Sequence, residues 1–235
     1  PTQEQLTKGR ALVGQAAAAH GGLERLRGIK DSTLEGDVVV TPGPRAQTGK
    51  VTQLRKDPDR FLFSLVLPAI KSTQVLNGDG GWSRTGGERG QIEDLDSVNV
   101  AGLRAGNRSD PCHLLLSAAD PASRAAWRGQ ERRNEQDTDV LEVVSVEGER
   151  RILFLEVDSH RLVAMEQYDR GHSVRRIYRD LRNVNGVLLP FNEERLLDGK
   201  PTMTFSWSRV AFNTGVKDAL FLKPGAKPAA DPAIP

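Results

Sequence analysis

Residues that could catalyse a reaction are few in this chain, and their spacing does not suit catalysis. Cys112 and His113 place a thiol beside an imidazole, and Asp158, Ser159 and His160 are the residue types of a hydrolytic triad. The first pair lies at the predicted start of a helix, where adjacent side chains point about 100° apart. The other three are consecutive in a predicted turn, which favours an Asx turn over a triad. We therefore expect a binding protein and no enzyme, with a hydrolase as an alternative.

The histidines and glycines also lack the spacing of a metal or phosphate site. His160 and His172 lie in turns at the two ends of one predicted strand, which separates them by roughly 25 Å. His20 lies at a predicted helix end, where interaction with the helix dipole would explain it. The glycines of residues 78–81 are not followed by the helix and the Lys-Ser/Thr pair of a phosphate-binding loop, so they indicate a hairpin turn. We expect no metal ion and no cofactor.

The composition argues against other classes of protein. The 235 residues include 33 basic and 31 acidic ones, for a net charge of +2, so nothing indicates binding to nucleic acid or to an anionic membrane surface. The arginine pairs at 132–133, 150–151 and 175–176 are expected on solvated faces. Cys112 is the single cysteine, so it forms no intrachain disulfide and is expected to be a buried thiol. No apolar stretch approaches the ~20 residues of a membrane-spanning helix, and no signal peptide is visible.

The apolar pattern predicts two helices followed by a long antiparallel meander. Helices are expected at residues 3–20 and 23–27, and strands from residue 32 onward, separated by Gly-, Asn- and Asp-rich turns. In the segment 203–208, bulky apolar residues alternate with small hydroxyl residues, as in a half-buried strand. Glu193 and Glu194 are neighbours on a predicted strand and therefore point to opposite faces, where they cannot act as an acid/base pair.

The strand pattern lapses between residues 91 and 126, where two short helices separated by residues 106–110 are predicted. Such an insertion can lie across the apolar face of the sheet. About ten or eleven strands are more than an open sheet usually holds without curling. The predicted fold class is α+β, mainly antiparallel β: a strongly curved, incomplete β-barrel with helices covering its concave face. We expect one domain at 1–224 and a disordered Pro/Ala-rich tail at 225–235.

Several short motifs resemble bacterial outer-membrane lipoprotein-sorting proteins and their LolA/LolB-like relatives. They are YRDLRNVNGVLLPF at 178–191, VAFN at 210–213 and DALFLKP at 218–224. NGDGGW at 77–82 resembles a hairpin of that family, and AHGGLERL at 19–26 resembles its opening helix. The similarity extends over most of the chain, from residue 19 to residue 224.

This resemblance implies a non-enzymatic carrier of the periplasm or outer membrane that holds lipid or lipoprotein acyl chains in an apolar cavity. It also implies an envelope protein as a partner of the carrier. The sequence has no N-terminal cysteine that could accept a lipid, and the arginine that holds the lid of lipoprotein chaperones closed matches no particular position. The alternative is a noncatalytic accessory domain that is appended to, or packs against, an envelope protein such as an insulinase-type peptidase.

The candidate cavity residues are large apolar side chains on the predicted strands. For each of them, ordinary core packing is the competing interpretation. They are Leu34, Val38, Phe61, Phe63, Leu65, Trp82, Phe154, Met165, Met203, Phe205 and Trp207.

Overall fold

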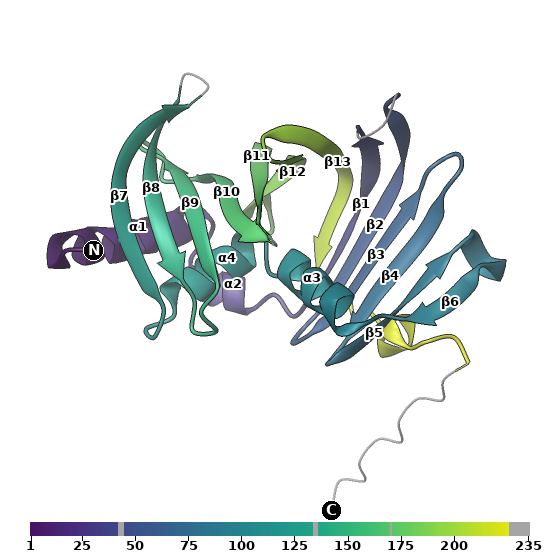
Figure 1. Ribbon diagram of the computed structural model, residues 1–235. Coiled ribbons are helices and arrows are strands. Elements are labelled where there is room, and N and C mark those ends of the chain that lie inside the picture. Colours follow the sequence, from purple (N-terminus) through teal and green to yellow (C-terminus); the bar gives the residue numbers. More distant parts are fainter. Residues whose placement is uncertain (42–44, 134–135, 170, 226–235) are drawn as a thin grey trace, which may run out of the picture.

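A single curled sheet of thirteen antiparallel strands dominates the computed structural model, which describes residues 1–41, 45–133, 136–169 and 171–225 (Figure 1). The strands are β1 (Asp31–Val40), β2 (Gln47–Lys56), β3 (Arg60–Val66), β4 (Lys71–Asn77), β5 (Gly80–Thr85), β6 (Gln91–Asp94), β7 (Arg124–Arg133), β8 (Gln136–Val144), β9 (Arg150–Glu156), β10 (Leu162–Asp169), β11 (His172–Val184), β12 (Val187–Leu197) and β13 (Lys200–Phe212). Their order is β6-β5-β4-β3-β2-β1-β13-β12-β11-β10-β9-β8-β7. The strands β6 and β7 are therefore the two edges, and the sheet is not closed.

The first and last strands of the chain pair in the middle of this sheet. β13 runs antiparallel to β1, with a register shift between Glu35 and Gly36. A side chain at Gly36 would collide with the backbone of Ser206, since an added Cβ would lie 2.2 Å from that carbonyl oxygen. The two halves of the meander thus meet at a glycine that allows close strand approach.

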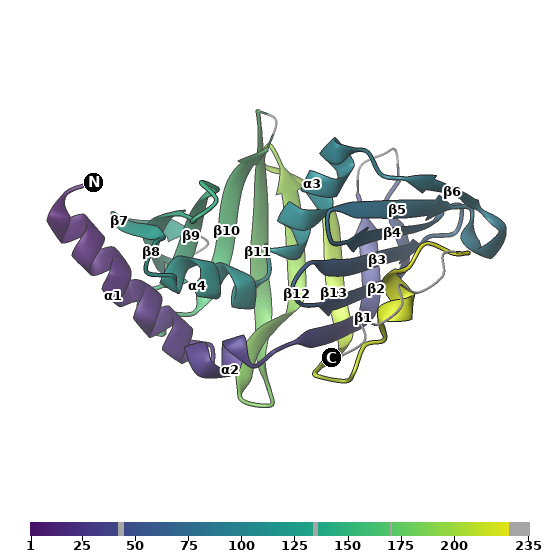
Figure 2. The ribbon, with the colours of Figure 1, turned by 90° about the horizontal axis from the view of Figure 1, so that it is seen from below.

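Four α-helices lie on one face of the sheet, which we call the inner face. They are α1 (Gln3–Ala19), α2 (Leu23–Arg27), α3 (Ser97–Asn107) and α4 (Pro111–Ala119). α1, α2 and α4 pack on β7–β12, and α3 packs near β3–β5 (Figure 2). Thr2 and Gln5 form a capping box at α1, and Asp96 and Asp110 cap α3 and α4 through their carboxylates.

The opposite, outer face of the sheet is covered at one end by the C-terminal segment. The short 3-10 helix η2 (Asp218–Phe221) places Phe221 against Val75 and Trp82. The Trp82 indole Nε1 donates a hydrogen bond to the Phe221 carbonyl oxygen at 3.1 Å. A second 3-10 helix, η1 (Gly87–Arg89), joins β5 to β6.

The predicted fold class is confirmed, including the two helices between residues 91 and 126. The sheet has thirteen strands, more than the ten or eleven predicted, and β6 was not predicted at all. This strand has four residues, of which only Ile92 is apolar, so it lacks the alternation of apolar and polar residues that predicts a strand. The turn expected at residues 42–44 and nearly all of the tail expected at 225–235 lie outside the described residues.

Two expectations about charged residues were wrong. Arg151 and Arg176 are each only 5% exposed, although both pairs were expected on solvated faces. Arg151 pairs with Glu149 at 2.6 Å and Arg176 with Glu193 at 3.2 Å, so each buried guanidinium has a carboxylate beside it. The carboxylate partner offsets the free-energy cost of burying each charge. A sequence pattern does not reveal such partners.

His20 does not interact with the helix dipole as a surface cation. Its side chain is fully buried between the end of α1 and strands β10 and β12. Its Nε2 accepts the Leu162 N–H at 3.1 Å, so its Nδ1 carries the proton and donates to the Leu188 carbonyl at 2.7 Å. Burial lowers the pKa of His20, and the ring is a neutral bridge between three elements.

Candidate functional site

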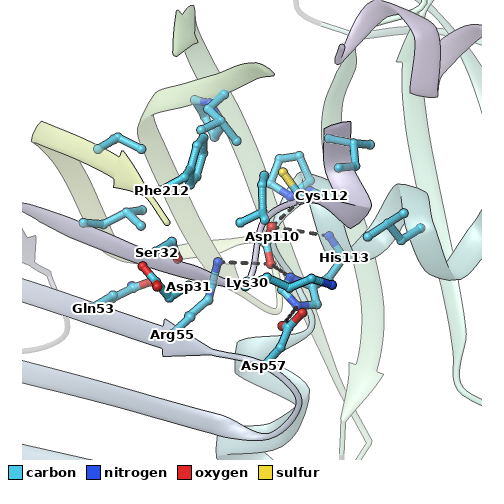
Figure 3. Close-up of a pocket in the computed structure, with 18 of the residues that line it drawn as sticks. Lys30, Asp31, Ser32, Gln53, Arg55, Asp57, Asp110, Cys112, His113 and Phe212 are labelled. Carbon is cyan, nitrogen blue, oxygen red and sulfur yellow. Dashed lines mark hydrogen bonds and ion pairs between the residues drawn. The ribbon is translucent and has the colours of Figure 1, made fainter. Parts of the chain in front are cut away.

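A cavity of about 80 Å³ lies on the inner face where α2 and α4 pass over the central strands. Its wall is built from seven parts of the chain: α2, the link into β1, strands β1 and β2, α4 with its capping residue, and strands β12 and β13. Figure 3 shows side chains from these elements converging on one space. The topology explains this convergence. β1 and β13 are far apart in the sequence, and their pairing in the middle of the sheet brings them side by side.

One side of the cavity is apolar. Trp207 is buried there, and several half-buried hydrophobic side chains line the rest of that side. They are Ile29, Leu34, Leu116, Val210 and Phe212. Leu34 lies opposite Val210, and the register shift after Glu35 places Trp207 opposite Gly36, so both strands contribute to the same wall.

The other side of the cavity is polar and contains an ion pair. Arg55 Nη1 lies 3.0 Å from Asp110 Oδ2, and both side chains are at least 85% buried. Asp110 also caps α4 through the Cys112 N–H, and its carboxylate bonds the His113 ring. Burial alone would raise the pKa of Asp110, but Arg55 and His113 outweigh burial and hold the pKa well below its usual value.

Next to this pair, Glu193 enters the cavity from β12 and holds two arginines. Its Oε1 accepts from Arg176 Nη1 at 3.2 Å and from Arg195 Nε at 2.6 Å. Burial opposes ionisation of Glu193, but Arg195 and Arg176 keep its pKa below the usual value. Burial also lowers the pKa of Arg195 to about 10, and the neighbouring Arg176 charge adds to this effect. The inner face therefore carries a buried network of charges beside an apolar wall.

Polar contacts tie the α3–α4 segment to this sheet. The Tyr178 hydroxyl donates to the Ser109 carbonyl at 2.8 Å, and Arg104 Nη2 donates to the Gly78 carbonyl at 2.9 Å. Arg55 holds the capping carboxylate at the start of α4. Of the residues of α3, only Val100 and Asn107 are buried, so α3 has a small apolar contact with the strands below.

The predicted cavity residues are distributed over several packing clusters. Leu34 and Trp207 line the cavity. Seven others lie on the inner face within the hydrophobic packing: Val38, Phe61, Phe63, Leu65, Met165, Met203 and Phe205. Trp82 lies on the outer face beneath η2, and Phe154 lines a separate hollow with Val163 and Arg175. Contact of these residues with a ligand stays a prediction.

The polar half of the site was missed by the sequence analysis. A signal for Gln53 and Arg55 existed in the alternation of β2, where Val51, Gln53 and Arg55 share one buried face. Polar residues at core-facing positions of a strand are uncommon and indicate a function or a buried partner. Nothing in the sequence, however, indicates that Asp110, more than fifty residues later, is that partner.

The candidate chemistry at Cys112 and among the histidines is not assembled. The Cys112 thiol is buried, which raises its pKa well above the usual value, while the His113 ring is bonded to Asp110. Within the described residues, no group of three or more potential ligands could hold a metal ion. No helix in the same part of the chain is long and apolar enough to cross a membrane.

No protein-family model matches this chain, and no curated protein matches it significantly. Solved structures do match. A domain described as an outer membrane lipoprotein-sorting protein domain, from Vibrio parahaemolyticus, is 15% identical with a TM-score of 0.58 and covers 92% of this chain and 97% of its own. A LolA superfamily protein from Nitrosomonas europaea is 13% identical, with a TM-score of 0.60 and the same two coverages. A DUF1329 family protein from Desulfovibrio piger is 14% identical, with a TM-score of 0.61, covering 93% and 97%.

Proposed function

We propose, from the fold that this chain shares with LolA-superfamily and lipoprotein-sorting domains, that it is a carrier of acyl chains in the cell envelope. The observation that carries the proposal is the cavity between the helices and the central strands, with its wall of half-buried apolar side chains. Burial of a hydrocarbon chain there is favoured by about 25 cal/mol of free energy per Å² of apolar surface removed from water, without any specific polar contact. The envelope location is proposed by analogy with the Vibrio domain, which is described as an outer membrane lipoprotein-sorting protein domain.

The size of the cavity limits what can bind while the helices stay in place. Its volume of about 80 Å³ is roughly half that of a ~150 Å³ apolar cavity that accepts benzene. A long acyl chain therefore requires part of the helical cover to move. α3 does not line the cavity itself, but it leads into the start of α4, which does. We expect α3 and the start of α4 to move together, because few apolar contacts hold α3 and such elements open at low cost.

Filling the cavity tests this proposal. Leu34→Trp adds a large side chain to the apolar wall, and we expect it to weaken binding of a fluorescent acyl glycerol at least tenfold. Leu197→Trp makes the same change at the exposed end of β12 and should leave affinity unchanged. Fluorescence titration measures both affinities, and circular dichroism checks that both variants are folded. The proposal fails if the unaltered protein binds no acyl probe, or if folded Leu34→Trp binds it as tightly as the unaltered protein does.

A further inference from the structure

Two hydrogen-bond donors on β2 are buried at the cavity and have no hydrogen-bond partner among the residues that the structure describes. They are Gln53 Nε2 and Arg55 Nε, from side chains that share one face of the strand. Gln53 is 2% exposed and Arg55 is 9% exposed, and both line the cavity (Figure 3). A buried donor without an acceptor costs about 1–3 kcal/mol, so such a pair indicates that an acceptor occupies the space.

Three of the carboxylates at the cavity already accept hydrogen bonds from groups of the protein itself. Asp31 accepts from the backbone N–H groups of residues 214–216. Asp110 accepts from Arg55, Cys112 and His113, and Glu193 accepts from Arg176 and Arg195. Arg55 Nη1 pairs with Asp110, and Arg55 Nε is a buried donor that could serve a ligand.

The charge of the cavity wall selects the kind of acceptor. Four acidic residues line it, Asp31, Asp57, Asp110 and Glu193, against three cations from Arg27, Lys30 and Arg55. Arg55 already has the Asp110 carboxylate beside it, and Glu193 is paired with Arg176 and Arg195, so each guanidinium at this point of the wall already has a counter-charge. A second anion at Arg55 would face Asp110 and Glu193 in a poorly solvated space, where repulsion between like charges is large. A neutral carbonyl oxygen can accept from both donors without that repulsion.

We propose that Gln53 and Arg55 form a subsite for the neutral carbonyl oxygen of an acyl ester or amide, with the hydrocarbon against Leu34, Val210 and Phe212. This inference rests on the proposed function and specifies its ligand: a chain joined through a carbonyl, in preference to a free fatty acid. The donors lie on β2 and the apolar side chains on β1 and β13, so the head and the chain of one ligand have separate walls.

Ligands that differ in one group test the subsite on the unaltered protein. Monodecanoylglycerol carries an ester carbonyl, 1-O-decylglycerol replaces it by an ether, N-decanoylethanolamine carries an amide carbonyl, and decanoate carries a charge. Competition with a fluorescent acyl glycerol measures their affinities. We expect at least one carbonyl ligand to bind about tenfold more tightly than both the ether and decanoate. Comparison of monodecanoylglycerol with N-decanoylethanolamine shows whether the preferred carbonyl belongs to an ester or to an amide.

A variant then assigns the preference to the proposed residues. Gln53→Leu keeps the approximate size of the side chain and removes the donor, and we expect the tenfold preference for the carbonyl over the ether to shrink to about threefold or less. Gln74→Leu makes the same change on the same face two strands away, outside the cavity, and should keep the preference. The comparison of ligands on the unaltered protein stands even if Gln53→Leu fails to fold.

The outcomes separate the two proposals. If ester, amide and ether bind equally, or decanoate binds best, or folded Gln53→Leu keeps the full preference, the carbonyl subsite is wrong and carriage of acyl chains survives; the two donors then serve ordered water or an anion. If none of the four ligands binds, the proposed function and the subsite are both overturned.

Discussion

At the scale of single residues, the inner face is distinguished by charges buried where hydrophobic side chains would be expected. Glu193 is the centre of one group, since it is 6% exposed and bonds both Arg176 and Arg195. Its neighbour Glu194 points to the other face and pairs with the half-exposed Arg179 at 3.4 Å. Adjacent glutamates on one strand thus have very different environments.

We expect Glu193→Gln to lower the free energy of unfolding by about 3 kcal/mol, because it leaves two buried arginines without their counter-charge. Glu194→Gln is the matched control and should cost about 0.5 kcal/mol or less, since its ion pair is exposed to solvent. Urea unfolding monitored by circular dichroism measures both. Equal losses in the two variants would show that the Glu193 group contributes no more than a surface ion pair.

His20 gives the protein a predicted dependence on pH. Burial holds its pKa below the ordinary value in the folded state, so between about pH 6.5 and that lowered pKa the unfolded chain binds the proton and the folded chain does not. Its contribution is therefore complete above about pH 6.5 and is lost as the pH falls. We expect the free energy of unfolding to fall from pH 7 to pH 5, and less steeply in His20→Gln.

Urea unfolding at a series of pH values measures this slope. His172→Gln, which changes a ring at an exposed turn, should keep the loss that depends on His20. An identical slope in His20→Gln and the unaltered protein would contradict the assignment of the neutral bridge.

At the scale of elements, the sequence predicted what is written in local patterns. The ranges of α1 and α2 agree within one residue, because Gly21 and Gly22 end the first helix and period-two alternation begins at β1. The apolar alternation of Met203, Phe205 and Trp207 also placed their common face. Partners distant in the sequence carry no such signal, which is why the contacts of Arg55 with Asp110 and of His20 with Leu162 and Leu188 were not predicted.

The packing of α1 on the edge of the sheet gives a prediction with two opposite signs. An added Cβ at Gly9 would lie 2.5 Å from the Ala125 carbonyl oxygen, whereas at Gly14 nothing lies within 4 Å. We expect Gly9→Ala to destabilise the protein by about 1–3 kcal/mol through overpacking. Gly14→Ala should stabilise it by about 0.5–1 kcal/mol, because alanine favours a helix. Thermal unfolding measures both variants, and a stabilising Gly9→Ala would show that α1 is not seated closely on β7.

At the scale of the whole molecule, one continuous sheet is crossed on its inner face by helices from two parts of the chain (Figure 2). The cavity lies where these covers meet, above the central strands at which the beginning and the end of the sheet pair. A site so placed draws on seven parts of the chain, and only Leu34 and Trp207 of its wall were among the predicted residues. The curled sheet was predictable from the sequence, while the place where the two groups of helices meet over it was not.

The most direct measurement is native mass spectrometry of the protein, first as purified from a bacterial envelope fraction and then after incubation with monodecanoylglycerol. Our account predicts a complex with one acylated molecule per chain, identified by lipid extraction and absent or weak in Leu34→Trp. A protein that shows only its own mass in both samples, while remaining folded, would contradict the proposal that it carries acyl chains.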